Sequence, residues 1–178
     1  GPTVITAPYL FKELFKLFNE DIENYINFIP LNPWYRFYFD DFTFFDYGGT
    51  KESTVNEIKK FSSRDADGYL KMLDSSKSIY EIGYDKLATF PFHDFSNMVK
   101  IVPDMIKLRS FTNVYNHVSK YIKNENLRKA FSIQPLLVGG NPFTTTSIYC
   151  LIHYLERKDG IHFPLGGTAQ IVNQLKLL

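Results

Sequence analysis

The sequence is poor in the residues from which covalent cross-links and metal sites are built. Cys150 is the only cysteine among 178 residues, which excludes an internal disulfide and a multi-cysteine metal site. The histidines His93, His117, His153 and His162 are scattered along the chain without the spacing of a metal-ligand set. We therefore expect no metal centre, and a single cysteine agrees with a reducing compartment.

The chain also lacks an excess of either charge. Its 20 basic and 19 acidic residues give a net charge of +1, whereas nucleic-acid-binding domains usually carry a strong basic excess. The opening sequence GPTVITAPYL has neither the basic region nor the apolar region of a secretory signal peptide. We expect no nucleic-acid partner and a cytoplasmic location.

Several catalytic and nucleotide-binding motifs are absent. No two glycines are separated by a single residue, so the G-x-G-x-x-G dinucleotide fingerprint cannot occur. The Walker, G-x-S-x-G and H-E-x-x-H patterns are missing as well, and no alternating series of strands and helices is visible. The sequence therefore predicts no complete nucleotide-binding fold within these residues.

Aromatic residues, in contrast, are abundant. They make up 17% of the chain, with 17 Phe, 12 Tyr and 1 Trp. Such flat, bulky side chains suit either a densely packed core or a groove for an elongated apolar molecule. The composition leaves both interpretations open.

The longest unusual stretch covers residues 130–155, which contain no Asp, Glu, Lys or Arg. An uncharged stretch of this length must be buried or face an apolar ligand. It is not expected to span a membrane, because Pro135, the Gly139-Gly140 pair and Pro142 would break a spanning helix.

We expect this stretch to form a helix, a sharp turn and a second helix. The first apolar face would cover residues 127–138 and the turn residues 139–143. Thr145 would cap the second helix, and Gly160 would end it in the left-handed conformation. Gly139 and Gly140 fit either of two roles, relief of crowding in a helical hairpin or close approach of a ligand.

The rest of the chain predicts a mostly helical α+β fold with at least one β-hairpin. Helices are expected at residues 8–18, 21–26 and 51–61, and a long one follows a cap at Ser62 or Ser63. The aromatic runs 34–39 and 42–47 have the pattern of a hairpin, and residues 161–164 that of a short strand. Thr168 is expected to cap a final helix.

Two further features suggest contacts with other molecules. Residues 95–123 are basic, with Lys100, Lys107, Arg109, Lys120 and Lys123 against Asp104 alone. This mixture fits a solvated helix face over a core or an in-plane contact with a membrane. The turn Gly166-Gly167-Thr168 places backbone N–H groups at a helix N-terminus, where an anion could bind.

Four blocks of sequence carry a resemblance to a known family. They are GPTVIT at the start, residues 64–69 (RDADGY), residues 130–157 (AFSIQPLLVGGNPFTTTSIYCLIHYLER) and residues 160–168 (GIHFPLGGT). In these blocks, and in their order along the whole chain, the sequence resembles bacterial-type phytoene desaturases, the FAD-dependent carotenoid desaturases of the amine-oxidase-like flavoprotein superfamily.

The resemblance implies the substrate-binding domain of a two-domain FAD flavoprotein. Residues 1–7 would form the edge of the FAD-binding domain, residues 8–160 the substrate- and membrane-binding domain, and residues 161–178 a return into the FAD-binding domain. In this family the G-x-G-x-x-G element precedes the point where this sequence begins, and a glycine-rich flavin motif lies near the far C-terminus. We therefore expect an internal fragment, without the Rossmann portion.

The implied activity is oxidative desaturation of a linear polyene such as phytoene, with hydride passing to flavin N5. FAD would be approached by Gly1, Pro2, Thr3, Gly166, Gly167 and Thr168. The substrate tunnel would be walled by Phe131, Leu137, Gly139, Gly140, Asn141, Pro142, Phe143 and Tyr149. The enzyme would be associated peripherally with a membrane, from which it takes its lipid substrate.

No catalytic residue and no oligomeric state is assigned by the sequence. His93 and Asp94 could exchange a proton, but Asp94 also fits a helix cap. Two other functions remain compatible with the sequence. One is a non-catalytic module that binds an apolar ligand or a membrane, and the other is a carotenoid isomerase or saturase on the same scaffold.

Overall fold

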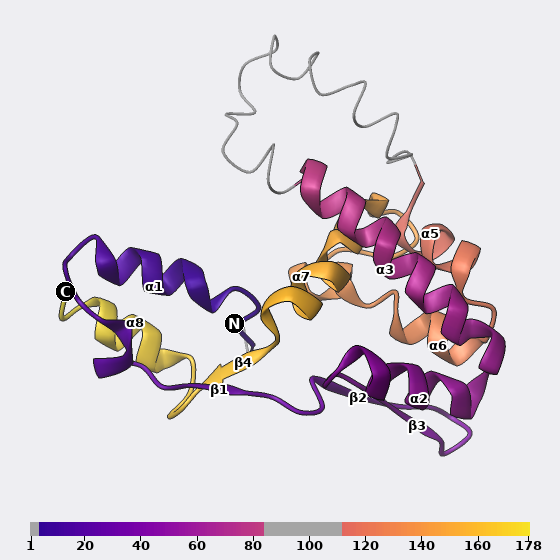
Figure 1. Cartoon of the computed structure of the whole chain (residues 1–178), viewed down its shortest axis with the longest axis horizontal. Coiled ribbons are helices and arrows are strands. Elements are labelled where there is room, and N and C mark those ends of the chain that lie inside the picture. Colours follow the sequence, from indigo (N-terminus) through magenta and orange to yellow (C-terminus); the bar gives the residue numbers. More distant parts are fainter. Residues whose placement is uncertain (1–3, 84–111) are drawn as a thin grey trace, which may run out of the picture.

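A computed structural model describes residues 4–83 and 112–178, which form a larger and a smaller lobe (Figure 1). The larger lobe holds a hairpin and most of the helices, and the smaller one holds the described ends of the chain. The elements in chain order are α1 (Pro8–Lys16), the 3-10 turn η1 (Ile22–Asn24), β1 (Phe28–Pro30), β2 (Tyr35–Tyr38), β3 (Phe44–Tyr47), α2 (Lys51–Phe61), α3 (Ser63–Gly83), α5 (Val114–Tyr121), α6 (Glu125–Ala130), the 3-10 helices η2 (Gln134–Val138) and η3 (Ser147–Cys150), α7 (Leu151–Asp159), β4 (His162–Pro164) and α8 (Ala169–Leu175).

The predicted α+β character and the predicted hairpin are both confirmed. Strands β2 and β3 pair antiparallel, with Tyr35 opposite Tyr47 and Phe37 opposite Phe45. The helices expected at residues 8–18 and 51–61 are present as α1 and α2. The helix expected at residues 21–26 is only the 3-10 turn η1, because the Asp21 side chain accepts the Glu23 N–H and closes a tight local turn.

An aromatic cluster fills the core of the larger lobe. The Phe131 ring stacks on Tyr69 at 5.3 Å between centroids and meets the edges of Tyr47 at 5.4 Å and Phe45 at 5.6 Å. All four side chains are almost completely buried. The dense-core interpretation of the aromatic content therefore accounts for these rings.

The start of α3 is tied to the segment between α5 and α6. Ser62 Oγ accepts the Asp65 N–H at 3.3 Å, as the predicted cap requires. The fully buried Asp65 carboxylate accepts the backbone N–H groups of Lys123 at 2.9 Å and Asn124 at 2.7 Å. One turn later, Gly68 lies so close to the Tyr121 carbonyl that a Cβ atom would collide with it.

The smaller lobe is built from both described ends of the chain (Figure 1). Its core consists of Ile5, Phe15, Ile22, Ile26 and Ile171. Strand β1 pairs antiparallel with β4, and Ile5 bridges His162 on β4. Strand β1 was not predicted from the sequence, and it ends at Pro30, whose missing N–H is tolerated at the edge of a sheet.

Within the described residues, 4–83 and 112–178, no helix is both long and apolar enough to cross a membrane. Residues 8–30 and 161–178 share the smaller lobe, although the sequence analysis assigned them to different domains.

Thr168 stands before α8, but its side chain makes no capping hydrogen bond, so the predicted cap at Thr168 is wrong. Its φ of −65° and ψ of −21° are already helical, whereas a capping residue usually has extended backbone angles.

Candidate functional site

The charge-free stretch does not form the two continuous helices that its composition predicted. Helix α6 ends at Ala130, and the following residues form the short 3-10 helix η2, which begins at Gln134 and Pro135. Proline has no N–H to donate to the preceding turn, so it starts a new helical segment rather than extending the old one.

The second arm consists of η3 followed by α7. Its N-cap is Thr146, whose hydroxyl accepts the Ile148 N–H, and not Thr145, whose N–H donates to the Asn141 carbonyl at 2.8 Å. Gly160 ends α7 with the expected positive φ of +74°. Its ψ of −179°, however, lies outside the left-handed helical region that was predicted.

The turn between the two arms is held by its own backbone. Gly139 adopts φ +76° and ends η2, and the Gly140 N–H donates to the Pro135 carbonyl at 2.7 Å. A Cβ atom on Gly140 would lie 2.8 Å from Thr145 Oγ1, whereas one on Gly139 would meet nothing within 4 Å. Asn141 Oδ1 accepts the Phe143 N–H at 2.9 Å. Gly139 therefore has a conformational reason to be glycine and Gly140 a steric one, and contact with a ligand remains a prediction.

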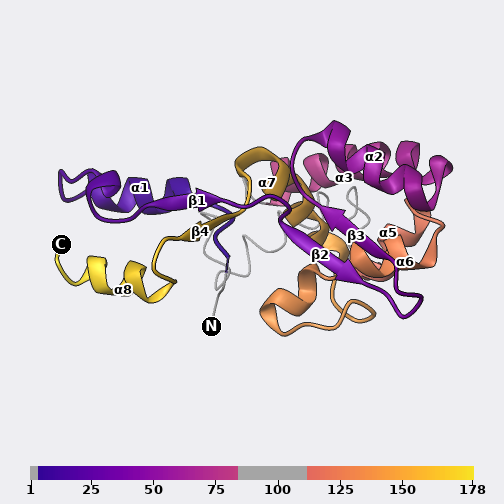
Figure 2. The ribbon, with the colours of Figure 1, turned by 90° about the horizontal axis from the view of Figure 1, so that it is seen from below.

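This turn presents an apolar surface to solvent. Leu136, Leu137, Val138 and Phe143 are 58%, 48%, 62% and 60% exposed, and we call these four side chains the loop patch. Figure 2 shows the segment that carries them projecting from the body of the larger lobe. Clustered exposed apolar side chains on a rigid support are typical of a surface that contacts another apolar molecule.

The predicted tunnel residues fall into two groups. Leu137 and Phe143 belong to the loop patch, and Gly139, Gly140, Asn141 and Pro142 form the turn that supports it. Phe131 is only 1% exposed and lies in the aromatic core, and the partly buried Tyr149 packs against the same core. These two residues support the segment from inside.

A buried histidine fixes the base of the loop. His153 Nε2 donates to the Phe131 carbonyl at 3.0 Å, and its Nδ1 accepts from the Gln134 side-chain amide at 3.1 Å. Complete burial lowers the pKa of His153 to about 3, so the ring is neutral and keeps this tautomer. The sequence analysis missed His153 and Gln134, although polar side chains inside a charge-free block are the signal of buried hydrogen-bonding groups.

A second buried group joins α7 to the hairpin and α2. Glu156 is fully buried and accepts the Tyr35 hydroxyl at 3.1 Å. The Arg157 guanidinium donates to the Gly49 carbonyl at 2.7 Å and to Thr54 Oγ1 at 2.6 Å, and it lies over the Trp34 ring. The hairpin and the loop are thereby attached to one helix.

Burial raises the pKa of Glu156 to about 8, against the opposing effects of the Tyr35 hydrogen bond and the Arg157 charge. Between its ordinary pKa of 4.5 and about 8, the folded state therefore binds this proton more tightly than the unfolded state does. The stabilisation from Glu156 is complete below the lower value and is lost as pH rises toward the higher one.

We expect the free energy of unfolding of the wild type, measured relative to a Glu156→Gln variant, to fall as pH rises across this range. The glutamine keeps the shape of the protonated acid without titrating, and contributions from other groups cancel in the difference. Urea unfolding of both proteins at a series of pH values measures this difference in the free energy of unfolding. A difference that stays constant with pH would contradict the assignment of a protonated Glu156.

The glycine pair predicted to approach a flavin lies in the smaller lobe. Gly166 and Gly167 adopt φ +85° and +92°, and the Gly167 N–H donates to the Pro164 carbonyl at 2.9 Å. A Cβ atom on Gly167 would meet nothing within 4 Å, so this side of the turn is open to an approaching group. Such a turn fits a polar cofactor but does not identify one.

Other predicted residues lie outside the described part of the chain. They are Gly1, Pro2 and Thr3 at the flavin side, His93 and Asp94 as possible proton carriers, and Lys100, Lys107 and Arg109 of the basic segment.

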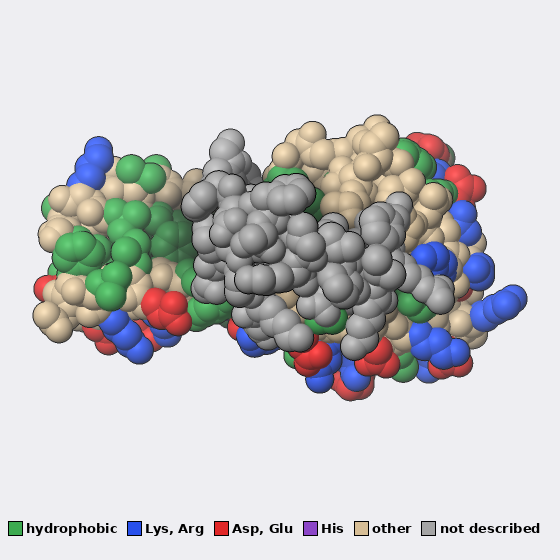
Figure 3. All heavy atoms as spheres, turned by 90° about the horizontal axis from the view of Figure 1, so that it is seen from above, with side chains coloured by type: hydrophobic (Ala, Val, Ile, Leu, Met, Phe, Trp, Pro, Cys, Tyr) green, Lys and Arg blue, Asp and Glu red, His purple; other side chains and the backbone are tan. Residues whose placement is uncertain are grey.

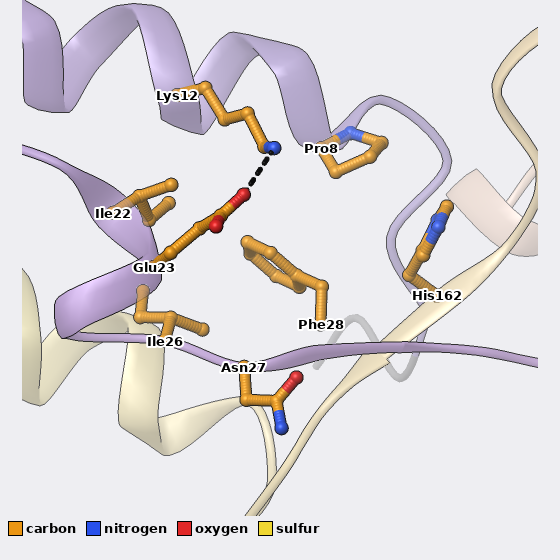
Figure 4. Close-up of a pocket in the computed structure, with 8 residues that line it drawn as sticks. All are labelled: Pro8, Lys12, Ile22, Glu23, Ile26, Asn27, Phe28 and His162. Atoms are coloured by element: carbon orange, nitrogen blue, oxygen red, sulfur yellow. Dashed lines mark hydrogen bonds and ion pairs between the residues drawn. The ribbon is translucent and has the colours of Figure 1, made fainter.

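A pocket that the sequence did not predict lies in the smaller lobe, between α1, η1, β1 and β4 (Figure 4). Its volume is about 390 Å³, and its lining includes Ile22, Ile26 and Phe28. Lys12 Nζ donates to Glu23 Oε1 at 3.0 Å on one side, and His162 lies on the opposite side. Because the lysine and the glutamate neutralise each other, the pocket offers no net charge from this pair to a ligand.

Comparison with known proteins confirms the resemblance that the four sequence blocks carry. The chain is similar to bacterial phytoene desaturases over 97% of its length. No protein-family model matches it.

The relatives include the lycopene-forming phytoene desaturases of Pantoea ananas, 44% identical over 172 residues, and of Pseudescherichia vulneris, 43% identical over 173 residues. The neurosporene-forming phytoene desaturase of Cereibacter sphaeroides is 33% identical over 171 residues, or 96% of this chain. The matched region is 35%, 35% and 33% of these three proteins, so the chain spans about a third of the length of the relatives it matches.

Proposed function

We propose that this chain is part of an FAD-dependent oxidoreductase that desaturates a linear, phytoene-like polyene in carotenoid biosynthesis. The observation that carries the proposal is the identity of 42–44% with lycopene-forming desaturases across nearly the whole chain. Because the chain matches only about a third of those proteins, the activity is assigned to the complete polypeptide.

The loop patch is the part of the described structure best suited to contact the substrate. A polyene hydrocarbon has no hydrogen-bonding groups, so its recognition rests on apolar area and shape. The loop patch supplies such area on a segment that contains no charged residue of its own, and His153 and the turn hydrogen bonds hold it in place. A preformed apolar surface costs little conformational entropy when the substrate binds.

The implied cofactor fits the small-lobe turn in one respect. Gly166, Gly167 and Thr168 would lie beside FAD, since the open side of Gly167 allows close approach to the backbone. FAD, when bound, accepts the hydride removed from the polyene. No residue among the described ones is assigned the role of acid or base.

We also propose peripheral association with a membrane, because a long polyene is soluble only in the lipid phase. The exposed apolar side chains of the loop patch support this location, as their contact with lipid or with lipid-derived substrate is favourable. Together these features support the proposal of an enzyme that draws an apolar substrate from a bilayer.

The double variant Leu137→Gln, Val138→Gln tests the contribution of the loop patch. In the complete polypeptide we expect desaturation of phytoene in liposomes to fall by about tenfold or more, because two apolar contacts of about 1–2 kcal/mol each are lost. The melting temperature should hardly change, since these side chains are 48% and 62% exposed.

Phe42→Gln is the matched control, because Phe42 is 97% exposed at the turn of the hairpin. Its replacement should leave desaturation near the wild-type rate. If the double variant keeps full activity, or loses activity only in proportion to unfolded protein, the loop patch does not contact the substrate.

A further inference from the structure

The smaller lobe has too little core for the apolar surface that it carries. Among the described residues its buried hydrophobic core consists of Ile5, Phe15, Ile22, Ile26 and Ile171. Outside its sheet, the lobe's large exposed hydrophobic side chains, which we call the small-lobe surface, are Leu10, Leu17, Phe18, Leu165, Val172 and Leu177. Figure 3 shows hydrophobic side chains gathered on one face of this lobe.

The sheet of this lobe is equally incomplete. Strands β1 and β4 form a two-stranded ladder of three residue pairs, and in its central pair Ile29 and Phe163 are 39% and 36% exposed. A two-stranded sheet is only marginally stable unless another element covers its apolar face. The lobe therefore resembles one part of a larger domain.

We propose that the small-lobe surface is an interface covered by the part of the same polypeptide that corresponds to the unmatched two thirds of the desaturase relatives. This proposal rests on the proposed function, since it takes the complete protein to be as long as those relatives. It also shifts the domain division, because α1, η1 and β1 then belong with β4 and α8 rather than with the substrate-binding lobe.

The charge of the lobe favours this occupant over a membrane. Residues 4–30 and 161–178 hold three lysines and four acidic residues. Surfaces that bind anionic lipid usually present clusters of basic residues, each contributing about 1 kcal/mol, and this lobe has no basic excess. Exposed side chains of Leu17 (78%) and Leu177 (69%) are instead typical of the core of an intramolecular interface.

Thiol modification of the complete polypeptide tests the proposal. We would place single cysteines at Leu17→Cys and Val172→Cys in the small-lobe surface, and at Lys59→Cys on the exposed polar face of α2 as the reference. The native Cys150 is fully buried, and burial raises its thiol pKa to about 12, so it contributes little background. Maleimide modification at each position is followed by peptide mass spectrometry.

We expect the Leu17→Cys and Val172→Cys thiols to react roughly tenfold or more slowly than the Lys59→Cys thiol, because a covered thiol reacts only when its interface opens. The protection should not depend on protein concentration or on added vesicles. Equal rates at all three positions would overturn the proposal. Protection that is lost on dilution would assign the surface to a contact with a second copy of the protein. Protection that appears only with vesicles would assign it to a membrane. Either result would overturn the proposal of an intramolecular interface. Protection without desaturase activity would reject the proposed function and leave the interface standing.

Discussion

Replacement of Gly68 by alanine is expected to destabilise the larger lobe by about 3 kcal/mol or more, because a Cβ atom there collides with the Tyr121 carbonyl where α5 crosses α3. The intrinsic preference of helices has the opposite sign, since alanine in place of glycine inside a helix gains about 1 kcal/mol. A loss of stability in the Gly68→Ala variant would therefore show that the two helices pack closely at this position, whereas a gain would reflect helix preference alone.

Gly83→Ala provides the matched control in the same helix. A Cβ atom on Gly83 would make only ordinary contacts, 3.7 Å from Leu151 Cδ2 and 3.9 Å from Ile148 Cγ2. We expect this variant to be neutral or slightly more stable. Both are measured by urea unfolding with the same spectroscopic signal. A Gly68→Ala variant as stable as wild type would show that α3 and α5 are not packed in this way.

The second large effect is expected at Asp65, whose buried carboxylate accepts the N–H groups of Lys123 and Asn124. Asp65→Ala leaves both donors without a partner in a buried site, at a cost of about 1–3 kcal/mol each. The free energy of unfolding should fall by about 3 kcal/mol, and helix α6, which begins directly after Asn124, should lose protection from hydrogen exchange first.

Asp67→Ala is the control for Asp65→Ala, since Asp67 lies two residues later in α3 and its side chain is exposed. We expect a change within about 0.5 kcal/mol for this variant. Equal effects of the two substitutions would mean that the loss at Asp65 reflects helix electrostatics and not the two hydrogen bonds to the segment between α5 and α6.

Local patterns in the sequence predicted many of the secondary-structure elements. Helices α1 and α2 follow from Pro8 and Thr50 at their starts together with periodic apolar residues, and the hairpin follows from two aromatic runs. These signals are local, because capping and turn formation involve residues only a few positions apart. The resemblance to phytoene desaturases also required only the sequence blocks themselves.

What the sequence could not predict depends on contacts between distant residues. The pairing of β1 with β4 joins Ile29 to Phe163, and no local pattern encodes that contact. The hydrogen bonds that His153 makes to Gln134 and Phe131 are also long-range, whereas the helix break at Pro135 is a local signal that the prediction of a continuous first helix did not apply. The burial of Phe131 could not be predicted from the sequence either, since an aromatic residue in an uncharged stretch fits a core and a ligand wall alike.

We propose above all that this chain belongs to an enzyme that removes hydrogen from a linear polyene. The most direct test is to purify the complete polypeptide with FAD, mix it anaerobically with phytoene in liposomes, and separate the polyenes by chromatography. We expect a product with a longer conjugated system, in an amount limited by the bound flavin until an electron acceptor is added. A folded, flavin-containing protein that leaves phytoene unchanged, with or without an acceptor, would contradict the claim.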